Sequence, residues 1–222
     1  EIILHLAAKV PTNKAKSNYE LVKKVNFYGT RNLINAINTQ QNKKIFFFFS
    51  STSHVYNFDK KKIKENFKKK GISKYGKTKI LAENLLIKNN KFFDLCIGRI
   101  SSLTSEKQST NFLIKKIIEI GKKNKNFNFG NSNIKRDFIY VDDVAKIISK
   151  IIKKRITGVI NISTSEVTNI FDLLNYMNKS YKFKINHFKG KEESLVLSNK
   201  FLIKKIGKYN FMNINQILKK FF

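Results

Sequence analysis

Two stretches of this chain decide its fold: Ser50-Ser51-Thr52-Ser53-His54-Val55-Tyr56 and, after a lysine-rich loop, Tyr75-Gly76-Lys77-Thr78-Lys79. The first follows the apolar run Ile45 to Phe49, which has the length and composition of a buried strand. The second opens a helical pattern whose apolar residues are Ile80, Leu81, Leu85 and Leu86. The sequence therefore predicts a strand end that carries hydroxyl groups, followed by a loop and a helix.

Tyr75 and Lys79 are four residues apart, so on a helix they share a face. A free tyrosine, with a pKa of about 10, is a poor base at neutral pH, and an adjacent ammonium group lowers that pKa. Such a tyrosine takes a proton from a sugar or alcohol hydroxyl while a hydride leaves the same carbon, and Thr52 would hydrogen-bond the reacting oxygen. Because lysine is abundant here, the spacing alone is also compatible with a surface helix that has a half-buried tyrosine.

The order Ser50-Ser51-Thr52-x-x-Val55-Tyr56, then Tyr75-x-x-x-Lys79, resembles the extended short-chain dehydrogenase/reductase family, the nucleotide-sugar epimerases and dehydratases. The resemblance implies that Thr52, Tyr75 and Lys79 are catalytic, with NAD or NADP as cofactor. It extends to Asn26-x-x-Gly29-Thr30 and to the segment from Arg136 to Ala145. Ser53 and His54 replace the Asp and Glu of the 4,6-dehydratase branch, which argues against dehydration.

The resemblance also implies binding residues for the cofactor and the substrate. The expected cofactor contacts are Leu6, Ala7, Ala8, Lys9, Asn26, Ser50, Tyr75 and Lys79. The expected substrate contacts are Thr52, Ser102 and Arg136. Ser102 stands where epimerases usually carry an Asn, and an ion pair with Asp137 or Asp142 is the structural alternative for Arg136. His5 is expected to be a hydrogen-bonded core histidine, and no metal site is predicted because the three histidines lie far apart.

The net charge of +30 would ordinarily suggest a nucleic-acid partner. The lysines are spread along the whole chain, however, whereas nucleic-acid modules concentrate charge on one element. We therefore expect no specific nucleic acid, no membrane partner, a nucleotide-sugar substrate and a homodimeric parent protein in the cytoplasm. The single Cys96 excludes an internal disulfide and is expected to lie in the core.

The expected fold is α/β: a Rossmann-like parallel sheet that lacks its first strands, with a small α/β substrate-binding lobe. Residues 1–104 and 136–166 are assigned to the dinucleotide domain, and residues 105–135 and 167–222 to the substrate-binding lobe. None of the chain's glycines forms the Gly-x-Gly-x-x-Gly turn that cradles a dinucleotide pyrophosphate. In the family resemblance, Ile2 to Leu6 matches the fourth strand, and the sequence is therefore expected to be truncated at its N-terminus.

The predicted activity of the parent protein is that of an NAD(P)-dependent nucleotide-sugar epimerase, similar to UDP-glucose 4-epimerase, with Tyr75 as the base at sugar C4. The first alternative is an NADPH-dependent 4-keto-sugar reductase that acts on dTDP- or GDP-sugars. The second is a relative that binds a cofactor or polyanions and has lost catalysis. The truncated chain alone is expected to be inactive.

Overall fold

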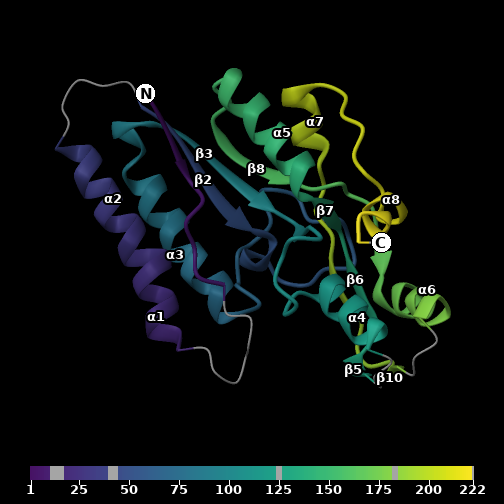
Figure 1. Cartoon of the computed structure of the whole chain (residues 1–222). Helices are drawn as coiled ribbons and strands as arrows, with labels where there is room; N and C mark the ends of the chain where they lie inside the picture. Colours follow the sequence, from purple (N-terminus) through teal and green to yellow (C-terminus); the bar gives the residue numbers. More distant parts are fainter. Residues whose placement is uncertain (11–17, 40–44, 124–126, 182–184, 222) are drawn as a thin grey trace.

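The structure is a computed structural model that describes residues 1–10, 18–39, 45–123, 127–181 and 185–221. Its centre is a sheet of parallel strands in the order β1-β2-β3-β8, with helices on both faces (Figure 1). These strands are β1 (Ile2–His5), β2 (Phe46–Thr52), β3 (Asp94–Ile100) and β8 (Gly158–Ile162). The expected α/β fold with a Rossmann-like parallel sheet is confirmed.

The phenylalanines of β2 explain why this strand lies inside the sheet. All of Phe46 to Phe49 have 0% exposure, because successive side chains point to opposite faces and both faces are covered. Phe47 and Phe49 join one hydrophobic cluster, whereas Phe46 and Phe48 join the cluster on the other face. Cys96 lies in the second cluster as predicted, and burial raises the pKa of its thiol to about 12.

The first face is covered by a long helical segment and by the helix with the Tyr-x-x-x-Lys motif. These elements are α1 (Tyr19–Lys23), the π-helix η2 (Lys24–Tyr28), α2 (Gly29–Asn38) and α3 (Lys74–Lys88). Leu81, one of the apolar residues of the predicted helical pattern, is exposed, whereas Lys79 and Glu83 are buried. The buried face of α3 is therefore partly polar, which a search for apolar spacing misses.

The second face is covered by α5 (Val141–Lys153) and α7 (Lys200–Ile206). Asp142 and Asp143 lie in the first turn of α5, where the helix dipole favours negative charge. Asp143 also accepts hydrogen bonds from the Tyr209 hydroxyl at 2.8 Å and the Met212 backbone N–H at 2.9 Å. The C-terminal segment is thereby attached to the N-terminal end of α5.

A further hydrophobic cluster contains α4 (Leu113–Lys122), α6 (Ile170–Tyr181) and α8 (Ile214–Lys219). These helices come from residues that the sequence assigns to the substrate-binding lobe, but Phe138 and Tyr140 of the other assigned range also belong to this cluster. The domain division remains a prediction.

Short strands form three smaller sheets near these helices. They are the pairs β10 (Ile185–Phe188) with β5 (Phe127–Asn131) and β4 (Ser102–Thr104) with β7 (Phe138–Tyr140), and the group β11 (Glu193–Leu195), β6 (Ile134–Arg136) and β9 (Thr168–Asn169). The remaining short helices are η3 (Ser53–Val55) and η4 (Asn90–Phe92).

Candidate active site

Thr52 is the last residue of β2 and is 9% exposed. Its hydroxyl oxygen accepts a hydrogen bond from the His54 backbone N–H at 3.3 Å and so caps η3. The strand therefore stops at Thr52 because the threonine side chain satisfies the first free donor of the following helical turn. This places a hydroxyl group at the carboxyl end of the sheet, where ligands bind in open α/β sheets.

The N-terminus of α3 is attached directly to this turn. Ser73 caps α3 by accepting the Gly76 N–H at 3.0 Å, and its hydroxyl also lies 3.1 Å from His54 Nδ1. The Ile72 N–H donates to the His54 carbonyl at 3.1 Å. A Cβ atom at Gly76 would lie only 2.1 Å from that carbonyl oxygen. Glycine is required here because it allows α3 to approach η3, and with it the end of β2.

Tyr75 and Lys79 lie one turn apart on α3. The Tyr75 ring is half-buried and its centroid lies 6.2 Å from that of His54. The Lys79 ammonium lies 3.9 Å from the centroid of the Phe49 ring on β2 and is almost fully buried. Both residues therefore lie beside the β2–η3 segment that contains Thr52. Convergence of the Thr52 and Tyr75 hydroxyls with the Lys79 amine remains a prediction.

Burial changes the pKa of both residues. It raises the pKa of Tyr75 to about 12, opposite to the direction expected from an adjacent ammonium group. It lowers the pKa of Lys79 to about 7, and the nearby Glu83 carboxylate acts in the opposite direction. Tyr75 thus carries its proton at neutral pH, as a free tyrosine also does.

Asn26 connects the loop after β1 to α3. Its side-chain oxygen accepts the Lys9 N–H at 2.7 Å, and its amide donates to the Lys9 carbonyl at 3.1 Å and to the Thr78 hydroxyl at 3.0 Å. Thr78 in turn donates to the Tyr75 carbonyl at 2.8 Å. Asn26 lies in η2, and π-helical turns of this kind often occur at functional sites.

The remaining expected cofactor contacts surround the same end of the sheet. Leu6, Ala7 and Ala8 follow β1 with exposed side chains, and Ser50 on β2 is half-buried. An exposed loop of small residues, fixed through its backbone by Asn26, suits close approach of a dinucleotide. These residues fit one side of a cofactor site, whereas a pyrophosphate-binding glycine turn is absent from the sequence.

The expected substrate residues Ser102 and Arg136 lie on the smaller sheets. The Ser102 N–H donates to the Asp137 carbonyl at 2.9 Å at the beginning of β4. Arg136 donates to the Glu193 carbonyl at 3.1 Å, and its guanidinium lies 3.8 Å from the Glu193 carboxylate. Burial lowers the pKa of Arg136 to about 10, and Glu193 opposes this effect. Arg136 thus pairs with Glu193, not with the Asp137 or Asp142 of the structural alternative.

Asp137 is instead a fully buried hydrogen-bond acceptor. It receives the Ser101 hydroxyl at 3.0 Å, the Thr164 hydroxyl at 2.9 Å and the Ser165 N–H at 3.2 Å. Burial raises the pKa of Asp137 to about 6, and these hydrogen bonds oppose the shift. Asp137 therefore joins the residues that follow β3 to those that follow β8.

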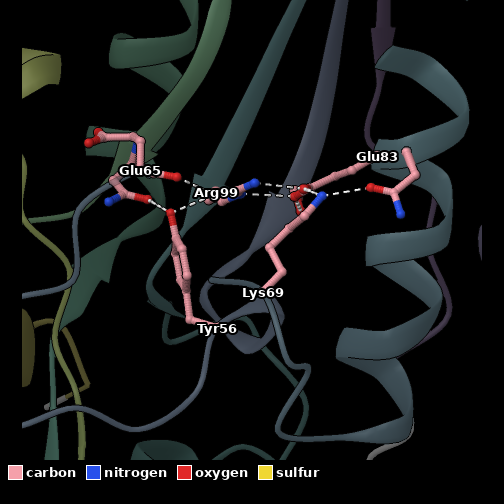
Figure 2. Close-up of polar contacts among 8 residues, drawn as sticks. Tyr56, Glu65, Lys69, Glu83 and Arg99 are labelled. Atoms are coloured by element: carbon pink, nitrogen blue, oxygen red, sulfur yellow. Dashed lines mark hydrogen bonds and ion pairs between the residues drawn. The ribbon is translucent and has the colours of Figure 1, made fainter. Parts of the chain in front are cut away.

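The sequence interpretation missed a buried polar network between α3 and the core strands. Figure 2 shows Arg99 on β3 between Glu83 and the hydroxyl of Tyr56, with Glu65 and Lys69 nearby. Arg99 meets the two carboxylate oxygens of Glu83 at 3.0 and 2.8 Å, a two-pronged ion pair. Glu83 follows Lys79 by four residues, and this spacing was the only sequence signal that could have drawn attention to it.

Among the described residues, no group of histidine, cysteine and carboxylate side chains could hold a metal ion. Within the same residues, the helices are too short or too polar to cross a membrane.

Comparison with known proteins finds a matching family model and a related protein of similar sequence. Residues 1–209 match the family model described as GDP-mannose 4,6 dehydratase. The chain is 32% identical to a GDP-6-deoxy-D-talose 4-dehydrogenase of Aggregatibacter actinomycetemcomitans over 182 residues, which are 78% of this chain and 60% of that protein. The chain thus spans somewhat under two thirds of this relative.

Two solved structures share the fold at lower identity. The first is a UDP-glucuronic acid 4-epimerase from Bacillus cereus in complex with UDP-glucuronic acid and NAD, with a TM-score of 0.88 and 23% identity, covering 99% of this chain and 73% of that chain. The second is RMD from Pseudomonas aeruginosa complexed with NADPH, with a TM-score of 0.86 and 19% identity. The match covers 99% of this chain and 78% of that chain. The family match over residues 1–209 includes the site residues described above, and the chain therefore belongs to the GDP-mannose 4,6 dehydratase family of extended short-chain dehydrogenases/reductases.

Proposed function

We propose that this chain carries the catalytic groups of an NAD(P)-dependent enzyme that transfers a hydride at C4 of a nucleotide sugar. The observation that carries the proposal is the attachment of α3 to the end of β2. Gly76 allows the first turn of α3 to lie against the His54 carbonyl, so Tyr75 lies next to the turn that begins at Thr52. A proton-transfer residue next to a strand-end hydroxyl suits chemistry at a carbon that bears oxygen.

Each residue has a separate role in this reaction. The Tyr75 hydroxyl exchanges the proton of the sugar C4 oxygen, the Thr52 hydroxyl hydrogen-bonds that oxygen, and the Lys79 ammonium stabilises negative charge on the phenol. Leu6, Ala7, Ala8, Lys9, Asn26 and Ser50 form the cofactor side, and Ser102 and Arg136 the substrate side. A bound nicotinamide cofactor supplies or accepts the hydride. The glycine-rich turn that binds a dinucleotide pyrophosphate is not among the residues of this chain.

The favoured net reaction is the interconversion of a 4-hydroxyl and a 4-keto group. The relative at 32% identity is a 4-dehydrogenase, and this is the highest identity among the proteins compared above. Donation of the Tyr75 proton to a ketone oxygen as the hydride arrives belongs to both the reductase and the epimerase reaction. The identity to a 4-dehydrogenase is therefore the observation that favours the reductase alternative of the sequence analysis over the epimerase.

Epimerisation at C4 is the second candidate, supported by the shared fold of the UDP-glucuronic acid 4-epimerase. It uses the same proton and hydride transfers and then returns the hydride to the other face of the ring. Dehydration is not proposed, because Ser53 is a buried hydroxyl and His54 bonds to Ser73. Neither position supplies a carboxyl group.

The test uses a form extended by the N-terminal segment that contains a glycine-rich turn. This protein is incubated with NAD⁺ or NADP⁺ and a panel of UDP-, dTDP- and GDP-sugars, followed by absorbance of the reduced cofactor and NMR of the sugar. Accumulation of reduced cofactor with a 4-keto sugar supports the dehydrogenase. A 4-epimer without net cofactor reduction supports the epimerase, and a protein that binds cofactor but transforms no sugar would refute both.

A further inference from the structure

The carboxylate of Glu83 is fully buried and has no part in the reaction proposed above. Its Oε1 accepts the Ser51 hydroxyl at 2.5 Å and Arg99 Nε at 3.0 Å. Its Oε2 accepts Arg99 Nη2 at 2.8 Å and the Lys69 ammonium at 3.3 Å. Burying a carboxylate is costly unless it is paired and hydrogen-bonded, and here both oxygens are satisfied.

These contacts join the elements that carry the candidate catalytic groups. Glu83 lies one turn after Lys79 on α3, and Ser51 immediately precedes Thr52 on β2. Arg99 lies on β3, so its ion pair with Glu83 connects this strand to α3 as well. The remaining guanidinium nitrogen, Nη1, donates to the Tyr56 hydroxyl at 2.7 Å and the Glu65 carbonyl at 2.9 Å. Figure 2 shows Glu83 on α3 paired with Arg99. One carboxylate therefore fixes the helix of Tyr75 and Lys79 against the strand end of Thr52.

The charges around Lys79 give Glu83 a second role. From β1, His5 faces Lys79, and burial together with the Lys79 charge lowers the pKa of His5 to about 4. From α3 itself, Glu83 is the charge that opposes the effect of burial on Lys79. The cations Arg99 and Lys69 hold the pKa of Glu83 below its usual range although burial acts to raise it. Glu83 is thus an ionised carboxylate next to a buried ammonium group.

We propose that Glu83 is a positioning residue that holds α3 against the carboxyl ends of β2 and β3 and places a negative charge one helical turn from Lys79. This inference rests on the role proposed above for Tyr75 and Lys79. Arg99 and Ser51 orient Glu83, and Glu83 acts on Lys79 across one helical turn, where side chains four residues apart are neighbours.

The experiment measures the titration of Lys79 in this chain by NMR of ¹³C-lysine, with the signal assigned from Lys79→Met. In Glu83→Gln, the Lys79 midpoint is expected to fall by about one pH unit or more, because the nearest negative charge is removed. Glu119→Gln on α4 is the matched control, since it removes a glutamate charge from an i,i+4 pair with Lys115. This control is expected to leave Lys79 unchanged.

A second variant separates positioning from general stability. Glu83→Gln leaves Arg99 as an unpaired buried charge, whereas Glu83→Gln/Arg99→Met removes both charges and is expected to recover folding. The Lys79 midpoint should remain low in the folded double variant, because the charge next to Lys79 is still missing.

Wild-type titration of Lys79 in either variant would overturn the proposal. It is also overturned if neither variant folds, because Glu83 would then serve folding as a whole. The measurement needs neither substrate nor cofactor. Lack of turnover in the extended protein, with the expected Lys79 shifts, would therefore contradict the proposed function and leave the link between Glu83 and Lys79 intact.

Discussion

At the residue scale, Lys79 shows what spacing predicts and what it does not. The four-residue interval places Tyr75 and Lys79 on one helical face, and α3 contains both. Enclosure of Lys79 by Phe49 from β2 and His5 from β1 depends on residues far away in the sequence. So does the pairing of Glu83 with Arg99. The Tyr75 pKa is raised by burial of Tyr75 itself, which the four-residue spacing does not reveal.

His5 is predicted to make stability sensitive to acid. Its Nε2 lies 2.9 Å from the Thr30 hydroxyl, and burial and Lys79 lower its pKa from 6.5 to about 4. The unfolded chain therefore binds more protons between these pH values, so His5 lowers the free energy of unfolding as the pH falls through this window. Asp137, whose pKa is raised to about 6, has the opposite dependence, so variants must be compared with wild type.

The measurement is the urea midpoint of wild type and His5→Gln at pH 4.5 and 7. The variant should lose less stability on acidification than the wild type. Equal losses in the two proteins would show that His5 titrates in the folded state as it does in the unfolded chain.

Gly76→Ala is predicted to destabilise the chain by about 1–3 kcal/mol, because a Cβ atom would overlap the His54 carbonyl oxygen and force α3 away from η3. Gly29→Ala is the control, since a Cβ atom at this helical glycine would meet the Lys24 carbonyl oxygen, the nearest atom outside its own turn, at 4.0 Å. That change should be neutral or stabilising, because alanine is the better helix former. Chemical denaturation compares the two variants. Equal stabilities of Gly76→Ala and Gly29→Ala would mean that the contact between α3 and η3 is not tight.

At the element scale, the sequence prediction is correct for β2 but not for the helical segment before it. The phenylalanine run predicts a strand covered on both faces, and the structure confirms it. The apolar spacing from Ser17 to Thr39 predicts one helix with Leu21 and Val25 on its core face, but the segment contains η2, and those two side chains are exposed. Asn26 is buried instead, because its amide bonds the Lys9 backbone and Thr78, an interaction that hydrophobic spacing does not reveal.

β1 is predicted to promote self-association. It lies at the edge of the main sheet, and Ile2 and Leu4 are 55% and 44% exposed. Unpaired backbone groups and exposed apolar side chains on an edge strand are a template for aggregation. Leu4→Lys should therefore lower aggregation of this chain in light scattering. Ile3→Lys is the contrasting variant, because Ile3 packs against the core and its replacement should destabilise the fold. Unchanged scattering for Leu4→Lys would place the association surface elsewhere.

At the scale of the whole molecule, the net charge of +30 is distributed over many elements. Exposed lysines include Lys77 on α3, Lys122 on α4 and Lys146 on α5. Binding to DNA is therefore predicted to be weak, independent of sequence and steeply reduced by added salt, because it depends on counterion release. Fluorescence titration of a labelled duplex at several salt concentrations tests this, and tight binding of one sequence at physiological salt would contradict it.

The family and the parallel sheet were predictable from motifs that occur in order along the chain. The substrate side was less predictable, because Arg136 pairs with Glu193 on a separate strand and its environment depends on packing between small sheets. The α7 helix was also missed, since lysines interrupt its short apolar pattern.

The most direct test of the proposed site is Tyr75→Phe in the extended protein that contains the glycine-rich turn. This substitution removes the hydroxyl that exchanges the C4 proton and keeps the ring beside His54. Calorimetric cofactor binding should remain close to that of wild type, while turnover of the nucleotide sugar falls by a factor of about 10²–10⁴, the usual contribution of a general acid or base. Turnover equal to that of wild type in Tyr75→Phe would contradict the assignment of Tyr75 as the proton-transfer residue.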